Sequence, residues 1–142
     1  MLYIIPTPIG NLKDFTLRAL EILQSVDGII CEDTRRTGLL LNHYQISKPL
    51  MVLNDYNEHK MFPRVINLLN QGQSLALVSD AGTPLISDPG YKLVRECLAL
   101  GIEVDSLPGP SSVITALTLS GLPPDKFLFL GYPPEKPGHR KD

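Results

Sequence analysis

A loop dense in glycine, proline, hydroxyl and carboxylate residues follows a short apolar run at residues 75–78. Its glycines and prolines are Gly82, Pro84, Pro89 and Gly90, and its polar residues include Asp80, Thr83, Ser87 and Asp88. Glycine lets a ligand approach the backbone closely, and proline fixes the path of the chain. An apolar strand that ends in such a loop is typical of ligand sites in open α/β sheets. The same composition also suits a well-capped turn without a ligand, so both interpretations stay open.

A second group of chemically capable side chains follows another apolar run and combines carboxylates with guanidiniums. Glu32 or Asp33 can orient or deprotonate a hydroxyl group, and Arg35 and Arg36 can hold phosphates. The structural alternative is that Asp33 or Thr34 only caps the next helix while both arginines stay in solvent. The spacing of these residues favours neither interpretation.

Several common chemistries are not supported by the sequence. There is no Gly-x-Gly-x-x-Gly and no P-loop pattern, so the usual dinucleotide and nucleotide phosphate cradles are absent. The three histidines, His43, His59 and His139, lack metal-ligand spacing. Cys31 and Cys97 stand in apolar surroundings without a Cys-x-x-Cys pattern, which predicts buried, reduced thiols and no metal site.

Composition indicates a globular chain rather than a disordered one. The 142 residues are 43% hydrophobic and 20% charged, enough for one domain and the edge of a second. The formal net charge of -2 does not favour nucleic-acid binding, which would need a local basic patch. No signal peptide and no membrane-spanning run is found, so we expect a cytoplasmic protein that does not associate with membranes.

Short apolar runs alternate with amphipathic stretches along the chain, which predicts an α/β fold. We expect strands at 2–5, 28–31, 50–53, 75–78 and 102–106, and helices at about 16–26, 37–44, 60–70, 90–100 and 112–120. Asp14 or Thr16 would cap the first helix, and Pro63 would lie in the first turn of the third. The prediction is an open, mostly parallel five-stranded sheet with helices on both faces. Its strand-end loops, 6–11, 32–36, 79–90 and 107–112, would meet at one edge.

The end of the chain follows a different pattern. A sixth apolar run at 127–136 comes after a Pro-Pro pair, and a polar segment at 137–142 follows it. We predict a first domain at 1–121, and at 122–142 a linker and the first strand of a C-terminal domain. The alternative is an edge strand with a frayed terminal segment.

The loops together resemble those of the tetrapyrrole methylase superfamily of S-adenosylmethionine-dependent methyltransferases. The resemblance rests on five ordered segments: PTPIGNL at 6–12, EDTR at 32–35, SDAGTPLISDPG at 79–90, PGPSS at 108–112 and FLGYPP at 129–134. Within the superfamily they look like the branch that methylates the ribose 2′-hydroxyl of a cytidine in small-subunit (16S) ribosomal RNA. Members that act on porphyrin-like rings have a Gly-rich first turn, and this chain has Pro6-Thr-Pro-Ile-Gly10 instead.

The resemblance implies that this chain supplies the N-terminal domain and half of a cleft for S-adenosylmethionine. The residues implied to line the cofactor half-site are Ile9, Ala81, Gly82, Thr83, Ile86, Ser111 and Ser112. The isoleucines would give apolar contacts, and Thr83 and the serines would give hydrogen bonds. Asp80 and Asp88 would suit the positive charge of the sulfonium and are less suited to catalysis.

The reaction that the resemblance implies also suggests roles for the charged residues at 32–36. A ribose hydroxyl is a weak acid, so a general base would help, and Glu32 and Asp33 are the candidates. Arg35 and Arg36 are the candidates for contact with RNA phosphate. The implied partners are 16S ribosomal RNA in the small subunit and a second copy of the chain. A small-molecule methyltransferase of the same superfamily and a non-catalytic cofactor-binding module are the alternatives.

Overall fold

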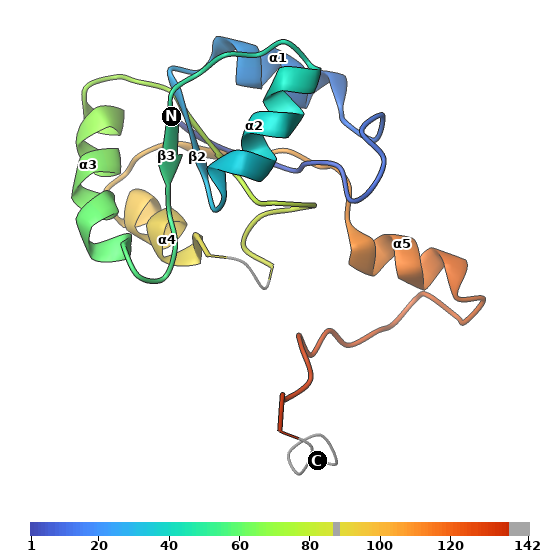
Figure 1. Cartoon of the computed structure of the whole chain (residues 1–142). Helices are drawn as coiled ribbons and strands as arrows, with labels where there is room; N and C mark the ends of the chain where they lie inside the picture. The colour runs from blue at the N-terminus through green and yellow to red at the C-terminus, as the bar shows by residue number, and fades with distance from the viewer. Residues whose placement is uncertain (87–88, 137–142) are drawn as a thin grey trace. The chain divides into compact units, whose positions relative to one another are not determined.

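A computed structural model describes residues 1–86 and 89–136, which fall in two compact units, Met1–Ser112 and Val113–Asp142 (Figure 1). The first unit alternates strands and helices. Its strands are β1 (Leu2–Ile5), β2 (Gly28–Cys31), β3 (Leu50–Val52), β4 (Leu75–Val78) and β5 (Val104–Ser106). Its helices are α1 (Leu17–Ser25), α2 (Thr34–His43), α3 (Glu58–Asn70) and α4 (Tyr91–Ala99). The predicted α/β class is confirmed.

All five strands are parallel and stand in the order β3-β2-β4-β1-β5. The chain moves in one direction through β1, β2 and β3, and then returns through β4 to β5. Because parallel crossovers are right-handed, this reversal places the later helices on the opposite face of the sheet. The connections after β4 therefore leave to one face, and those after its neighbours β1 and β2 leave to the other. Such a switch point is where open α/β sheets bind ligands.

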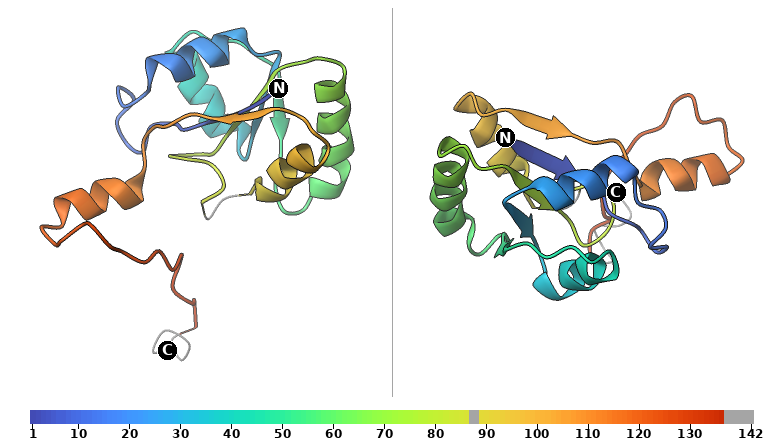
Figure 2. Two further views of the ribbon diagram at one scale, coloured as in Figure 1. Left: turned by 180° about the vertical axis from the view of Figure 1, so that it is seen from behind. Right: turned by 90° about the horizontal axis from the view of Figure 1, so that it is seen from above.

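Two apolar clusters confirm that helices cover both faces of the sheet (Figure 2). One face packs against Leu23 of α1 and Leu41 of α2, and the other packs against Leu69 of α3 and Leu93 of α4. Every residue of β2 and of β4 is buried, which explains why these strands are continuous apolar runs without alternation. Cys31 and Cys97 are buried free thiols, as predicted.

The helix starts differ from the predicted ones for reasons of capping. α2 begins at Thr34 rather than 37, because the Asp33 side chain accepts a hydrogen bond from the Arg35 amide. α3 begins at Glu58 rather than 60, so the expectation that Pro63 lies in its first turn is wrong. Thr16, not Asp14, caps α1 by accepting from the Ala19 amide.

The helix α5 (Ser112–Leu119) starts at the last residue of the first unit, continues in the second, and buries none of its side chains. Described residues beyond α5 form neither helix nor strand, and Phe127, Leu128, Leu130 and Tyr132 are exposed. The strand expected near residue 127 is not formed, because a strand needs a neighbour to pair with its backbone groups. That residues 122–142 open a further domain stays a prediction, and their last six residues, 137–142, lie outside the described part.

Among the described residues, no helix is both long enough and apolar enough to cross a membrane.

Candidate functional site

The carboxyl ends of β4, β1 and β5, which are neighbours in the sheet, lie close to one level. In the parallel register Ile5 pairs with Val78 and Ile4 with Ser106, so the loops after β1, β4 and β5 start at the same edge. The first two loops then join through an antiparallel bridge in which Thr7 and Gly82 exchange both backbone hydrogen bonds, each 3.0 Å. The buried Thr7 hydroxyl also donates to the Ser79 carbonyl at 3.3 Å.

The loop after β5 is fastened to the other two. The Thr83 hydroxyl donates to the Pro110 carbonyl at 3.0 Å. A Cβ atom on Gly109 would stand 2.6 Å from Cβ of Pro6, so only glycine permits this approach. Gly82 has a φ of +78°, and a Cβ there would stand 3.2 Å from Cγ2 of Ile9. We call these three connected segments, 6–11, 79–86 and 107–112, the interlocked loops.

The predicted cofactor residues all lie on the interlocked loops, but they differ in what they offer a ligand. Ile9 and Ile86 are 38% and 53% exposed and present apolar surface. Gly82 is buried, and its backbone groups are used by the Thr7 bridge. Thr83 already donates its hydroxyl proton to Pro110, so towards a ligand it is left as an acceptor.

The remaining predicted cofactor residues are more open. Ala81 and Ser112 are exposed, Ser111 is half-buried, and Ser112 is the first residue of α5. Ser87 and Asp88 lie outside the described residues.

The segment after β2 carries the predicted catalytic and RNA-binding side chains. Asp33 caps α2 and pairs with Arg35, whose Nη2 lies 3.2 Å from Oδ2 of Asp33. These hydrogen bonds from Arg35 hold the pKa of the Asp33 carboxyl below its ordinary value of 3.8. Glu32 is half-buried, and the Arg35 side chain is 88% exposed.

Three carboxylates, Glu32, Asp33 and Asp80, follow β2 and β4 where these two paired strands end. Burial raises the pKa of the Cys31 thiol above its ordinary value of 9.0, a hydrogen bond with Thr37 opposes that shift, and the charges of Asp80, Asp33 and Glu32 add to it. The three carboxyl groups therefore all act on one thiol at this edge. Within residues 1–86 and 89–136, no group of three or more His, Cys, Asp or Glu residues is placed to hold a metal ion.

A cavity of about 320 Å³ opens between the loop after β1, the helix α2 and the end of β4. Its apolar lining is Pro8, Leu12, Leu39 and Leu40, and Thr7, Gly10, Arg36 and Asp80 complete it. The Tyr44 hydroxyl, at the end of α2, donates to the Leu12 carbonyl and fastens two of the walls together.

Two lining residues of this cavity, Asp80 and Arg36, are charged. Oδ1 of Asp80 is buried and has no hydrogen-bond partner in the described structure. Arg36 is exposed and forms no ion pair with any described residue. Sequence reasoning treated Asp80 as a residue of the cofactor loop. Its position directly after β4, beside the end of β2, is the signal that could have grouped it with Glu32 and Asp33.

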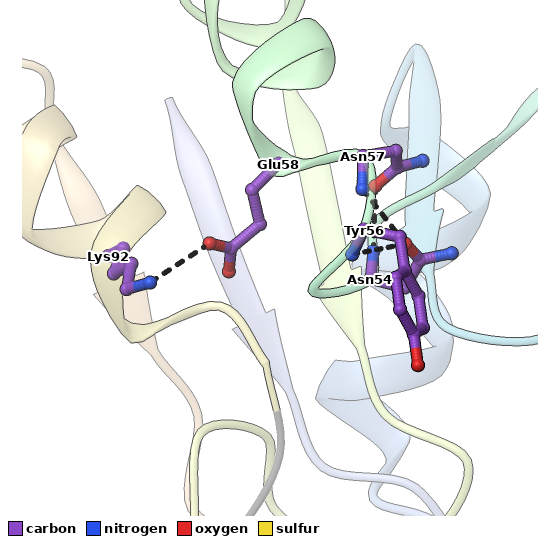
Figure 3. Close-up of polar contacts among 5 residues, drawn as sticks. All are labelled: Asn54, Tyr56, Asn57, Glu58 and Lys92. Carbon is purple, nitrogen blue, oxygen red and sulfur yellow. Dashed lines mark hydrogen bonds and ion pairs between the residues drawn. The ribbon is translucent and has the colours of Figure 1, made fainter.

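The loop after β3 is held by side-chain amides, and an ion pair between Glu58 and the half-exposed Lys92 follows it (Figure 3). Oδ1 of Asn54 accepts from the amides of Tyr56 and Asn57, at 2.9 and 3.0 Å. Glu58, 7% exposed, accepts from Nζ of Lys92 at 3.3 Å and so links α3 to α4. This loop leaves Tyr56 97% exposed.

The parallel sheet and the interlocked loops define a class of protein. The chain belongs to the tetrapyrrole (corrin/porphyrin) methylase family, whose model matches residues 1–140. The solved structure of uroporphyrin-III-C-methyltransferase from Thermus thermophilus shares the fold, with a TM-score of 0.64 and 22% identity, over 86% of this chain and 53% of that one.

Curated relatives that share one name are much more similar to this chain than the solved structure is. Ribosomal RNA small subunit methyltransferase I of Escherichia coli O157:H7 is 57% identical over 99% of this chain and 49% of its own length. The proteins of the same name from Vibrio cholerae and Thermotoga maritima are 57% and 52% identical, over 100% and 99% of this chain and 49% and 63% of their own lengths. The chain spans about half the length of most of the curated relatives that it matches.

Proposed function

We propose that this chain is the N-terminal part of an S-adenosylmethionine-dependent methyltransferase. Its substrate is the ribose 2′-hydroxyl of a cytidine in 16S ribosomal RNA of the small subunit. The observation that carries the proposal is the 57% identity, across nearly the whole chain, to proteins named ribosomal RNA small subunit methyltransferase I. The family membership and the interlocked loops support the methyl-transfer class.

The interlocked loops suit the proposed cofactor. The exposed side chains of Ile9 and Ile86 offer apolar contact to an adenine ring. Thr83, Ser111 and Ser112 add hydroxyl oxygens at the same edge. When bound, the cofactor supplies an electrophilic methyl group, and no metal is needed for that chemistry. The protein's contribution is to hold the ribose hydroxyl in line with the methyl carbon.

Glu32 is the better candidate for the base that accepts the ribose 2′-hydroxyl proton. The carboxyl group of Asp33 is occupied by the α2 cap and by Arg35, which keep its pKa low and make it a weaker base. Asp33 is then a positioning residue that orients Arg35. Arg35 and Arg36 stand at the start of α2, exposed, where RNA phosphate can reach them.

The test is methyl incorporation into small ribosomal subunits by the full-length protein, mapped to the modified atom. We expect a methyl group on a ribose 2′-oxygen of a cytidine, and loss of at least 100-fold in kcat for Glu32→Ala. Methylation of a tetrapyrrole-like small molecule instead would establish the first alternative. No turnover, together with cofactor binding by titration, would establish the non-catalytic alternative.

The remaining expectations accompany this proposal. A second domain closes the cofactor cleft, the protein forms a homodimer, and it acts in the cytoplasm. Residues 1–142 alone are expected to be inactive and to bind S-adenosylmethionine weakly, because half of the cleft would be missing. Turnover by residues 1–142 alone would refute this.

A further inference from the structure

We propose that the cavity between the loop after β1, α2 and the end of β4 receives the methylated nucleotide itself. In this pocket Asp80 accepts a hydrogen bond from the exocyclic amine of a flipped-out cytosine. The inference rests on the proposed function and deepens it, because it names the group that selects the base. It also moves Asp80 from the cofactor loop to the substrate.

The first step is the shape and lining of the cavity. Its volume is about 320 Å³, and Pro8, Leu12, Leu39 and Leu40 give it apolar walls. A planar base packs well against such walls, and enzymes that modify nucleotides bring the target out of its stack into a pocket of this kind. The walls come from two elements that Tyr44 ties together, so the pocket is largely pre-formed.

The second step is the buried acceptor. Oδ1 of Asp80 has no hydrogen-bond partner among the described residues, although most buried polar atoms in proteins have one. An unpaired carboxylate oxygen in a buried position is costly, and a donor from a ligand would relieve that cost. Thr7 lines the same cavity, but its hydroxyl donates its proton to the Ser79 carbonyl. It therefore does not supply the donor that Oδ1 of Asp80 lacks.

The third step is the match to one base. Cytosine carries an amine that donates, whereas uracil carries a carbonyl oxygen at the same ring position, and Asp or Glu is the side chain that accepts from that amine. The half-buried carboxylate of Asp80 on the cavity lining therefore favours cytosine over uracil, whose oxygen would face it without a hydrogen bond. Arg36, exposed and without an ion pair in the described structure, lines the same cavity and can hold the phosphate of the inserted nucleotide.

A competing occupant is the amino-acid end of S-adenosylmethionine, whose ammonium and carboxylate would also suit Asp80 and Arg36. The cavity lining includes none of the residues implied for the cofactor half-site, from Ile9 to Ser112. Pro8, Gly10 and Asp80 of the lining adjoin Ile9 and Ala81 along the chain, so the cavity lies beside the cofactor half-site and the experiment measures both occupants.

The experiment compares full-length wild-type protein with Asp80→Asn, and with Asp55→Asn as a matched control. Asp55 is exposed, lies outside the cavity lining, and loses the same charge in the same substitution. The substrates are small subunits reconstituted with RNA that carries either cytidine or uridine at the methylated position. Two quantities are measured: kcat/KM for each RNA, and the Kd of S-adenosylmethionine by calorimetry.

We expect the wild type and Asp55→Asn to prefer cytidine by at least tenfold, about the discrimination that one well-placed base contact provides. In Asp80→Asn the preference for cytidine should fall below about threefold, because an amide can accept from cytosine and donate to uracil. The Kd of S-adenosylmethionine should change by less than about twofold in this variant. A second variant, Leu39→Trp, fills the cavity from a residue that is 73% exposed and so does not disturb the core. It should raise KM for RNA at least tenfold with the cofactor Kd unchanged.

Three results would overturn the proposal: a wild type that accepts both RNAs equally, an Asp80→Asn variant that keeps the tenfold preference, or a tenfold weaker cofactor Kd with the preference intact. The last result would mean that S-adenosylmethionine, and not the nucleotide, occupies the cavity. If Asp80→Asn does not fold, an unchanged KM for RNA in Leu39→Trp overturns the proposal instead. A wild type that methylates neither RNA contradicts the proposed function, which is a different and recognisable result.

Discussion

The two sides of the carboxyl edge of the sheet are built in different ways. In the interlocked loops the polar contacts involve the backbone, as in the Thr7–Gly82 bridge and the Thr83 hydroxyl on the Pro110 carbonyl. Gly109 and Pro6 add a close steric contact. The segment after β2, and the cavity that α2 forms with the loops after β1 and β4, carry charged side chains. There Oδ1 of Asp80 has no hydrogen-bond partner and Arg36 has no ion pair within the described residues.

The difference matches the difference between the two proposed ligands. A cofactor presents the same groups in every turnover, so a site fixed by backbone hydrogen bonds and tight glycine contacts can be rigid before it binds. A nucleotide in RNA must enter and leave, and its recognition depends on side-chain charges that stay unsatisfied until it arrives. Backbone changes on the first side should therefore damage stability and cofactor binding, and side-chain changes on the second should damage substrate use.

The largest effect is expected from Gly109→Ala. A Cβ at this position would lie 2.6 Å from the buried Pro6 Cβ, so the backbone of two interlocked loops would have to separate. We expect a loss of about 1–3 kcal/mol in the free energy of unfolding, and at least tenfold weaker S-adenosylmethionine binding. Denaturant unfolding and calorimetry of the full-length protein measure these two quantities.

Gly38→Ala is the matched control for that substitution. Gly38 lies inside α2, and a Cβ there would meet nothing within 4 Å. The same change should stabilise the protein by about 0.5–1 kcal/mol, because alanine favours a helix over glycine. If both variants lose stability equally, the loops are not held as closely as the contact of Pro6 and Gly109 indicates.

A smaller effect on the same side is expected from Thr83→Val. Valine keeps the shape of threonine but cannot donate to the Pro110 carbonyl, so the link between the second and third interlocked loops is lost. We expect about 1 kcal/mol of destabilisation and a few-fold weaker cofactor binding. Thr83→Ser keeps the hydroxyl and should bind the cofactor like the wild type. Equal cofactor affinity in all three proteins would show that this hydrogen bond does not shape the site.

Much of the interlocked side could be predicted from the sequence, because the information is local. Continuous apolar runs gave β1, β2 and β4 with their observed bounds, and the Gly- and Pro-rich segments that follow them had to be loops. The partner of Thr83 could not be predicted. Pro110 lies 27 residues further along the chain, and no local pattern connects the two.

The cavity side was harder to predict, because it depends on strand order. Leu39 and Asp80 line one cavity only because β4 is inserted between β1 and β2, and spacing along the chain does not specify that insertion. The role of Asp33 as a helix cap was one of two interpretations that the sequence left open, and the structure shows the cap. Whether Glu32 or Asp33 acts as a base stays a prediction.

On the cavity side, the two arginines should differ in how they change the salt dependence of RNA binding. Arg36 has no ion pair in the described structure, so Arg36→Ala should lower the slope of log K against log salt by about one. Arg35 is already paired with Asp33, so Arg35→Ala should lower the slope by less than one. Filter-binding titrations at several salt concentrations measure both slopes. Equal slopes in the two variants would mean that the pair with Asp33 opens when RNA binds.

The smallest effect is the pH dependence of the α2 cap. Because hydrogen bonds from Arg35 lower the pKa of Asp33 below 3.8, the charged cap stabilises the folded state above that pH. The contribution is lost as the pH falls through the folded-state pKa. The stability difference between the wild type and Asp33→Asn should therefore shrink in that acidic range and stay constant above it. In Arg35→Ala the Asp33 carboxyl, followed by carbon NMR, should titrate closer to 3.8. A wild-type pKa at or above 3.8 would show that the pair with Arg35 is not formed in solution, and would return Asp33 to equal standing with Glu32 as a base.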